Sequence, residues 1–421
     1  MAHPPAERSL PPRSLVVLVA LLLASTTINY IDRQVLSVLA PVIRDEFRLS
    51  NAQYAAIVNA FMITYFFAMP LAGWVLDRVG VGRGLSLAVL WWSLAGMFTS
   101  LSRGPLSMAF FRSLLAVGEA GAWPSFAKAV AIWVPLKWRT LAIGVCNSGS
   151  SLGAVLAPPL VVFLTRRYGW QAAFIVTGCL GFFWVAAFQV FRFFHPQMRA
   201  GASAATSETT RVPWTSLLRY RQSWAIFFCR FFADPLWYFY IFWIPEFLAR
   251  ERGMNLGGIG AVAWIPFLVA DISNFATGFL ALALERSGWS VHRTRRTLMI
   301  LGAFVSPIGA AAVFASTLFS TLAFICVAIF FWMIWSVTVQ TLAADFFPSH
   351  AVASVYGIGG AGSTSGSVLS IWAVGATLDL TRSYVPVFIG LGAAMPVAYF
   401  LGTYLMGRVE PLSLRQSVGK P

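Results

Sequence analysis

The segment NYIDRQ at residues 29–34 places an acid and a base, Asp32 and Arg33, inside a stretch that is otherwise apolar from Leu15 onward. A charged side chain near the middle of a membrane helix costs roughly 2.5 to 3.5 kcal/mol on insertion scales, so such residues usually face a bundle interior or an aqueous cavity. The planar fork of an Arg can hold a carboxylate by two parallel hydrogen bonds. The segment therefore predicts half of a binding site for an organic anion, with Arg33 as the anchor.

Two further charged residues in apolar surroundings extend this site. Arg112 lies two helical turns before Glu119, about 10.5 Å along a helix axis, which predicts an ion pair between two long side chains. Burial disfavours a charged carboxyl group and a nearby Arg favours it, so Asp32 and Glu119 are candidate proton carriers. The alternatives are structural ones: an Asp32–Arg33 pair, although adjacent helical residues do not face each other, or a purely structural Arg112–Glu119 pair.

The composition is that of a membrane protein. Of the 421 residues, 58% are hydrophobic and 11% are charged, whereas a soluble domain typically has about 25% charged residues. Apolar runs of about 20 residues, the length that crosses a hydrocarbon core, recur along the chain. We therefore expect an all-α integral membrane protein. No HExxH motif and no metal-spaced His and Cys cluster indicates an enzyme, a cofactor or a metal site.

Hydropathy predicts twelve membrane spans in two halves. The spans cover residues 15–41, 52–76, 84–103, 105–134, 139–164, 168–194, 223–249, 258–284, 297–316, 320–346, 351–378 and 383–407. The longest polar segment contains the run GASAATSETT and reads as a flexible linker. The predicted organisation is a tail (1–14), a six-helix bundle (15–194), the linker (195–222), a second six-helix bundle (223–407) and a tail (408–421). No cleaved signal peptide is expected, because the first span has no cleavage site.

The basic residues indicate an orientation rather than a nucleic-acid partner. The formal net charge is +15, but the basic residues are scattered through short loops. Lys and Arg are roughly twice as frequent on the side that holds both termini, which predicts cytoplasmic termini and a cytoplasmic linker. The four cysteines lie in apolar segments without a CxxC pair, so we expect packed thiols rather than disulfides or metal ligands.

The two halves resemble each other in sequence. The segment GSSLGAVL at residues 149–156 in the fifth span matches GSTSGSVL at residues 362–369 in the eleventh span at most positions. Internal symmetry of this kind is typical of transporters that bind their substrate between two repeats. The bundle is therefore expected to hold a central site.

The loop after the second span, GWVLDRVGVGR at residues 73–83, resembles the signature loop of the major facilitator superfamily. The resemblance implies the major facilitator fold, in which this loop latches cytoplasmic helix ends together in the outward-facing state. It gives Asp77, Arg78 and Arg83 a gating role. An ordinary tight turn is the alternative.

Four other stretches are similar to the anion:cation symporter branch of that superfamily, and within it to bacterial hexuronate transporters. They are NYIDRQ (29–34), GEAGAWP (118–124), NSGSSLGAVLAPP (147–159) and DPLWYFYIFWIP (234–245). The resemblance assigns proton coupling to Asp32 and Glu119, and sugar-acid contact to Tyr30 and Tyr65. We add Trp237, Tyr238, Ser150 and Ser365 as further candidate substrate contacts.

Trp237 also bears on the choice of substrate. It precedes Pro245 by eight residues, as Arg33 precedes Pro41, so the two positions are equivalent in the two halves. Related sugar-phosphate antiporters carry an Arg at both positions. One cation opposite an aromatic face suits a monocarboxylate on a sugar-like body better than a phosphate.

Two other charged features are predicted to be structural. Arg230 and Asp234 are four residues apart in the seventh span, which predicts an intrahelical ion pair. Lys128 lies toward the end of the fourth span and is expected to extend to the membrane interface.

The expected function is proton-coupled import of a hexuronate or similar sugar acid by a monomer in a bacterial inner membrane. Relatives that carry a sugar acid tend to have an Asn in the eleventh span where this chain has Gly, Ser and Thr. Symport of another organic anion, such as an aldonate, an aromatic acid or a dicarboxylate, therefore stays open, as does a membrane sensor that does not transport.

Overall fold

The computed structural model describes residues 10–49, 51–196, 198, 214–254, 262 and 264–412. Within these ranges the chain folds into helices joined by short turns and forms no strand. The predicted linker at residues 195–222 and the two predicted tails lie largely outside the described residues, so those boundaries stay predictions.

The first half of the chain supplies the helices of one bundle. These are α1 (Pro12–Val38), α2 (Ala40–Glu46), α3 (Asn51–Val79), α4 (Val81–Thr99), α5 (Pro105–Glu119), α6 (Ala122–Trp133), η1 (Leu136–Trp138), α7 (Arg139–Tyr168) and α8 (Trp170–Phe194). After the short α10 (Trp214–Leu217), the second half supplies the other bundle. These are α11 (Arg221–Arg252), α13 (Ile265–Arg286), α14 (Val291–Val305), η3 (Ser306–Val313), α15 (Leu318–Phe346), α16 (Val352–Thr381) and α17 (Val385–Met406).

Each predicted span corresponds to one long helix or to two consecutive shorter ones. Nine helices in the described part of the chain are long and apolar enough to cross a membrane. The fourth predicted span is not one of these nine, because a turn at Ala120 and Gly121 divides it into α5 and α6, of 15 and 12 residues. The all-helical membrane fold is confirmed, and the division lies next to Glu119 at the end of α5.

The sequence repeat occupies equivalent places in the two bundles. In the first, Gly149 and Gly153 of α7 lie against the backbone and side chains of α1. In the second, Gly362 and Gly366 of α16 lie against backbone carbonyls of α11. A Cβ atom at any of these four positions would overlap the neighbouring helix, so the small residues allow the helices to pack closely. The repeat therefore sets the position of α1 and α11, the two helices that carry Arg33 and Trp237.

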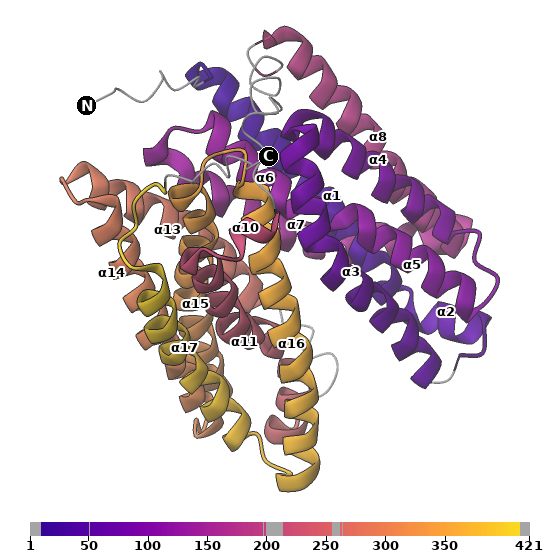
Figure 1. Ribbon diagram of the computed structural model, residues 1–421. Coiled ribbons are helices and arrows are strands. Elements are labelled where there is room, and N and C mark those ends of the chain that lie inside the picture. Colours follow the sequence, from indigo (N-terminus) through magenta and orange to yellow (C-terminus); the bar gives the residue numbers. More distant parts are fainter. Residues whose placement is uncertain are drawn as a thin grey trace.

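The most extensive contacts between the two bundles join α3 to α16 and α7 to α13. Gly73 of α3 lies against the carbonyl of Ala353, and Gly144 of α7 lies against the carbonyl of Asn274. In Figure 1 the bundles converge at the top, where α1 begins, and diverge toward the bottom of the view. We call the top the termini side, because α17 also ends there and Leu412 donates to the carbonyl of Phe346 at the end of α15.

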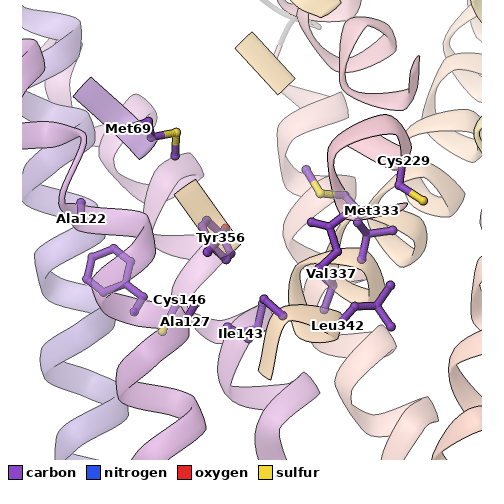
Figure 2. Packing of buried hydrophobic residues seen from close by; sticks show 14 of the residues in the cluster. Met69, Ala122, Ala127, Ile143, Cys146, Cys229, Met333, Val337, Leu342 and Tyr356 are labelled. Carbon is purple, nitrogen blue, oxygen red and sulfur yellow. The ribbon is translucent and has the colours of Figure 1, made fainter. Parts of the chain in front are cut away.

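A buried apolar cluster joins the bundles below the termini side. It includes Met69 of α3 and Ile143 of α7 from the first half, and Met333, Val337 and Leu342 of α15 from the second. Figure 2 shows these side chains lining the facing surfaces of the two bundles. The helices are thereby held in place around the site described next.

Candidate functional site

A polar cavity lies between the two bundles, about half-way along the long helices. From the first half it is lined by Tyr30, Arg33, Tyr65, Met69, Trp123, Asn147 and Ser150. From the second half it is lined by Arg230, Asp234, Trp237, Tyr238, Trp332, Met333, Ser336, Gln340, Tyr356, Gly360, Ser363 and Thr364. The cavity leaves about 90 Å³ for the centres of water-sized spheres, and one water needs roughly 10 to 15 Å³ by that measure. The space therefore has room for several waters and is lined by aromatic and polar side chains.

Arg33 lies at the first-half wall of this cavity and is already paired. Its Nε and Nη2 atoms donate to Oε2 of Glu119 at 2.9 and 2.7 Å. The Arg33 side chain is 18% exposed, whereas that of Glu119 is fully buried. The guanidinium also lies 5.0 to 5.2 Å from the ring centres of Tyr30, Phe61 and Tyr65, a distance at which cations are attracted to ring faces. Arg33 is thus held on the cavity wall by one carboxylate and three rings.

The predicted ion pair between Arg112 and Glu119 is wrong in this structure. Arg112 forms no ion pair within the described residues, and its buried Nε and Nη1 atoms have no hydrogen-bond partner there. Its guanidinium instead lies 4.8 Å from the ring centre of Phe61. The physical reason is that Arg33, arriving from α1, reaches Glu119 directly and occupies its Oε2. Arg112 remains close enough to interact electrostatically with Glu119.

Asp32 faces away from the cavity into the first bundle. It is 2% exposed, and its carboxylate lies beside the side chain of Thr177 in α8. Its electrostatic neighbours are Glu119 and Arg112. Asp32, Arg33, Arg112 and Glu119 therefore form one cluster of two acids and two bases, with Arg33 at its cavity face. In the described part of the chain, no group of three or more His, Cys, Asp or Glu could hold a metal ion.

Most of the predicted substrate contacts line the cavity. Tyr30, Tyr65 and Ser150 do so from the first half, and Trp237 and Tyr238 from the second. Ser365 does not: its hydroxyl donates to the carbonyls of Ala361 and Gly362 in its own helix. Its place in the lining is taken by Ser363 and Thr364, because one step along a helix turns a side chain by about 100°.

Trp237 forms an aromatic wall with a residue that sequence reasoning missed. Its ring stacks on that of Trp332 with centres 5.2 Å apart and planes 5° apart. The indole of Trp332 is fixed in turn by donation to the carbonyl of Ala233 at 2.7 Å. Trp332 lies in a strongly apolar span, where nothing in the sequence separates it from the other aromatic residues. The stacked pair offers a flat apolar surface on the second-half side of the cavity.

A chain of hydrogen bonds was also only partly visible in the sequence. Tyr356 of α16 donates to Oε1 of Gln340 at 2.7 Å, and Gln340 donates to the hydroxyl of Ser336 at 3.0 Å. Gln340, a polar residue in an apolar span, was the one signal for this group. The predicted intrahelical pair is confirmed, since Nε of Arg230 lies 3.0 Å from Oδ2 of Asp234. Both of these residues line the cavity, which the sequence did not indicate.

The bundles are closed on the termini side by a buried carboxylate. Asp77, near the end of α3, accepts hydrogen bonds from the backbone N–H groups of Ala353 and Ser354 at 3.3 and 2.7 Å. These amides belong to the first turn of α16, whose own cap residue, Ala351, supplies no side-chain hydrogen bond. A helix N-terminus favours an anion because its amides are unpaired and its dipole is positive there. Asp77 therefore caps a helix of the opposite bundle.

The prediction that Lys128 extends to the membrane interface is wrong. Its side chain is fully buried, with Nζ 2.9 Å from Oδ1 of Asp77 and 3.0 Å from the carbonyl of Leu76. A buried carboxylate needs a counter-charge, and α6 presents Lys128 to it directly. His350 lies in the turn before α16, where burial and the positive charge of Lys128 lower its pKa. His350 therefore adds no second positive charge beside Asp77 and Lys128 near neutral pH.

Arg78 and Arg83 do not take part in the latch on the termini side, which consists of Asp77, Lys128 and the first amides of α16. Both are exposed, and the Arg78 guanidinium lies 3.6 Å from the ring centre of Trp74 in its own helix. Lys128, rather than either of these arginines, pairs with Asp77. A second contact between the bundles comes from Arg139 of α7, which donates to the carbonyl of Ala344 of α15 at 2.9 Å.

Replacing Lys128 with Met should open the termini side. Removing one partner of a buried ion pair costs about 3 to 5 kcal/mol, and Asp77 can escape that cost by leaving α16 for water. Spin labels at the exposed positions Arg83 and Ser287, in a cysteine-free background, would then show a longer distance component. Lys128→Arg keeps the charge and should preserve the short distance. An unchanged distribution in Lys128→Met would show that Asp77 does not need this cation.

Comparisons with known proteins agree with this geometry. A family model described as Major Facilitator Superfamily matches residues 22–371. The hexuronate transporter of Escherichia coli (strain K12) is 31% identical over 409 residues, covering 93% of this chain and 93% of that protein. The galacturonate transporter of Dickeya chrysanthemi is 31% identical over 283 residues, covering 64% of this chain and 82% of that protein. The solved structure of the proton:xylose symporter XylE has a TM-score of 0.73 at 13% identity, covering 94% of this chain and 97% of that chain. The chain belongs to the Major Facilitator Superfamily, whose members are membrane transporters rather than enzymes.

Proposed function

We propose that this transporter imports a hexuronate or a similar sugar acid together with protons, by alternating access. The observation that carries the proposal is the Arg33–Glu119 pair, in which the cation faces the cavity and the acid is fully buried behind it. Two relatives that are each 31% identical to the chain are named hexuronate transporter and galacturonate transporter. A carboxylate on a hydroxylated ring matches the Arg33 guanidinium on one side of the cavity and the stacked aromatic wall on the other.

Coupling follows from competition for one guanidinium. While Glu119 is ionised, it occupies both Nε and Nη2 of Arg33. A proton on Glu119 cancels its charge, so the substrate carboxylate can take over those donors. Loss of that proton on the other side of the membrane returns Arg33 to Glu119 and expels the substrate. Asp32, in the same cluster, is proposed as a second proton carrier.

Accumulation of an anion against the membrane potential requires coupling of this kind. A negative-inside potential opposes its entry by about 2.3 kcal/mol per charge per 100 mV, and co-transported protons offset this cost. We assign the termini side to the cytoplasm, so the structure corresponds to an outward-facing arrangement that Asp77 and Lys128 hold closed inside. The transporter is proposed to act as a monomer in the bacterial inner membrane, with no nucleic-acid partner and no cofactor.

Uptake into proteoliposomes tests the proposal. Labelled glucuronate should accumulate faster with an acid-outside pH gradient than without one, and liposomes without protein should show neither signal. Uptake at the same rate with and without the gradient would contradict proton coupling. A preparation that transports galactonate or an aromatic acid but not glucuronate would contradict the assigned substrate and leave the transport mechanism unchanged.

A further inference from the structure

We infer that the Arg230–Asp234 pair is the subsite for the hydroxyl groups of the substrate, and that it selects hydroxylated monoacids over acids without hydroxyls and over diacids. The inference rests on the proposed function and assigns specificity within the same cavity. It replaces the purely structural role that the i, i+4 spacing suggested for this pair.

The pair leaves hydrogen-bonding capacity unused at the cavity wall. Nε of Arg230 holds Oδ2 of Asp234 at 3.0 Å, with side chains 13% and 8% exposed. Within the described residues, Nη1 of Arg230 has no hydrogen-bond partner, and Asp234 accepts through Oδ2 alone. Unpaired donors and acceptors in a buried ion pair cost free energy. Here the unused groups belong to two residues that line the cavity.

The chemistry of the pair matches a hydroxyl group. A hydroxyl accepts a hydrogen bond from the guanidinium and at the same time donates one to the carboxylate. A second carboxylate on the substrate could only accept, and would bring a negative charge next to Asp234, where like charges destabilise each other. An apolar ring would leave the buried donor and acceptor unpaired. A site built to bond a hydroxyl rejects the analogue that lacks it, by factors of about 10⁴ or more in the strongest cases.

The surroundings of the pair extend the same preference. The Arg230 guanidinium lies 5.3 Å from the ring centre of Tyr356, whose hydroxyl begins the hydrogen-bonded chain to Gln340. Tyr238 also lines the cavity and lies near both Arg33 and Asp234. A sugar acid would place its carboxylate at Arg33 and its hydroxyls at Arg230 and Asp234.

Binding measurements on the full-length transporter in nanodiscs test this assignment. The ligands are glucuronate, cyclohexanecarboxylate, which has the acid and ring but no hydroxyls, and galactarate, which has two carboxylates. The unaltered protein should bind glucuronate more tightly than either competitor. Asp234→Asn should weaken glucuronate binding about 10-fold or more, the usual effect of losing a hydrogen bond to a charged group. It should leave cyclohexanecarboxylate within about 2-fold and strengthen galactarate relative to glucuronate, because a like charge is gone.

The matched control removes an ion pair outside the cavity. Arg408 and Glu410 form an exposed pair, 81% and 65% accessible, and Glu410→Gln should leave all three affinities unchanged. An Asp234→Asn protein with the unaltered ratio of glucuronate to cyclohexanecarboxylate affinity would overturn the inference. If that variant does not fold, the unaltered protein decides: equal affinity for galactarate or cyclohexanecarboxylate and for glucuronate would also overturn it. An unaltered protein that binds galactonate or another acid but not glucuronate contradicts the proposed function itself, which is a separate result.

Discussion

Arg33→Ala is expected to weaken glucuronate binding by about 30-fold or more. Truncating one partner of a buried, hydrogen-bonded charge pair costs about 2 to 5 kcal/mol or more, which corresponds to roughly a 30-fold to several-thousand-fold loss of affinity. Arg33 carries this effect because it is the cation on the first-half wall of the cavity. Isothermal titration in nanodiscs measures the loss directly. Arg33→Lys keeps the charge but not the planar fork, so it should retain part of the affinity.

The same substitution has a second effect that must be separated from binding. Without Arg33, the fully buried Glu119 loses its partner, and an uncompensated buried charge destabilises a protein by about 3 to 5 kcal/mol. The double variant Arg33→Ala with Glu119→Gln removes that charge. It should recover thermal stability and still bind glucuronate weakly. Recovery of binding in the double variant would show that Arg33 acts only as the counter-charge of Glu119.

The fold was predictable because membrane helices have a strong sequence signal. Every backbone polar group in lipid must be satisfied within a helix or a closed barrel, so apolar runs of about 20 residues define the helices. The repeat at residues 149–156 and 362–369 also indicated two symmetric halves, and both copies lie against the first helix of their own bundle. The turn at Gly121 was not predicted, since a single Gly within an apolar run does not by itself end a helix.

The charged residues of the candidate site could be predicted from the sequence, but the ion pairs between them could not. The rarity of charge in apolar spans singled out Asp32, Arg33, Arg112 and Glu119. Helical spacing then favoured the local partner, Arg112, for Glu119, because only separations along one helix can be read from a sequence. The structure shows the partner arriving from a different helix, α1. The pairing depends on the packing of α1 against the bundle, which the sequence does not encode locally.

The latch illustrates the same limit. The motif at residues 73–83 identified Asp77, but its cation is Lys128, which lies 51 residues further along the chain and is fully buried. The amides that Asp77 caps belong to the opposite bundle. A Lys near the end of a predicted span is more often found at the interface, so the sequence favoured the wrong environment. The contact between Asp77 and α16 forms because the two bundles are closed on the termini side.

Glu119→Gln is expected to separate substrate movement from the proton gradient. Glutamine has nearly the size of a protonated glutamic acid and carries no charge, so Arg33 stays available to the substrate at any pH. Counterflow of unlabelled against labelled glucuronate should persist within about 3-fold, because it needs binding and rocking but no net proton movement. Uptake driven by an acid-outside gradient should fall about 10-fold or more. Proteoliposomes made from one preparation can measure both activities.

The pH dependence of binding decides whether Glu119 competes with the substrate. In the unaltered protein, glucuronate should bind more tightly as the pH falls, because protonation of Glu119 releases Arg33. In Glu119→Gln the affinity should be high and nearly independent of pH, and a remaining slope should vanish when Asp32→Asn is added. Gradient-driven uptake that stays normal in Glu119→Gln, with normal counterflow, would remove Glu119 as a proton carrier. The Arg33–Glu119 pair would then be structural, and the coupling proton would have to be carried by Asp32.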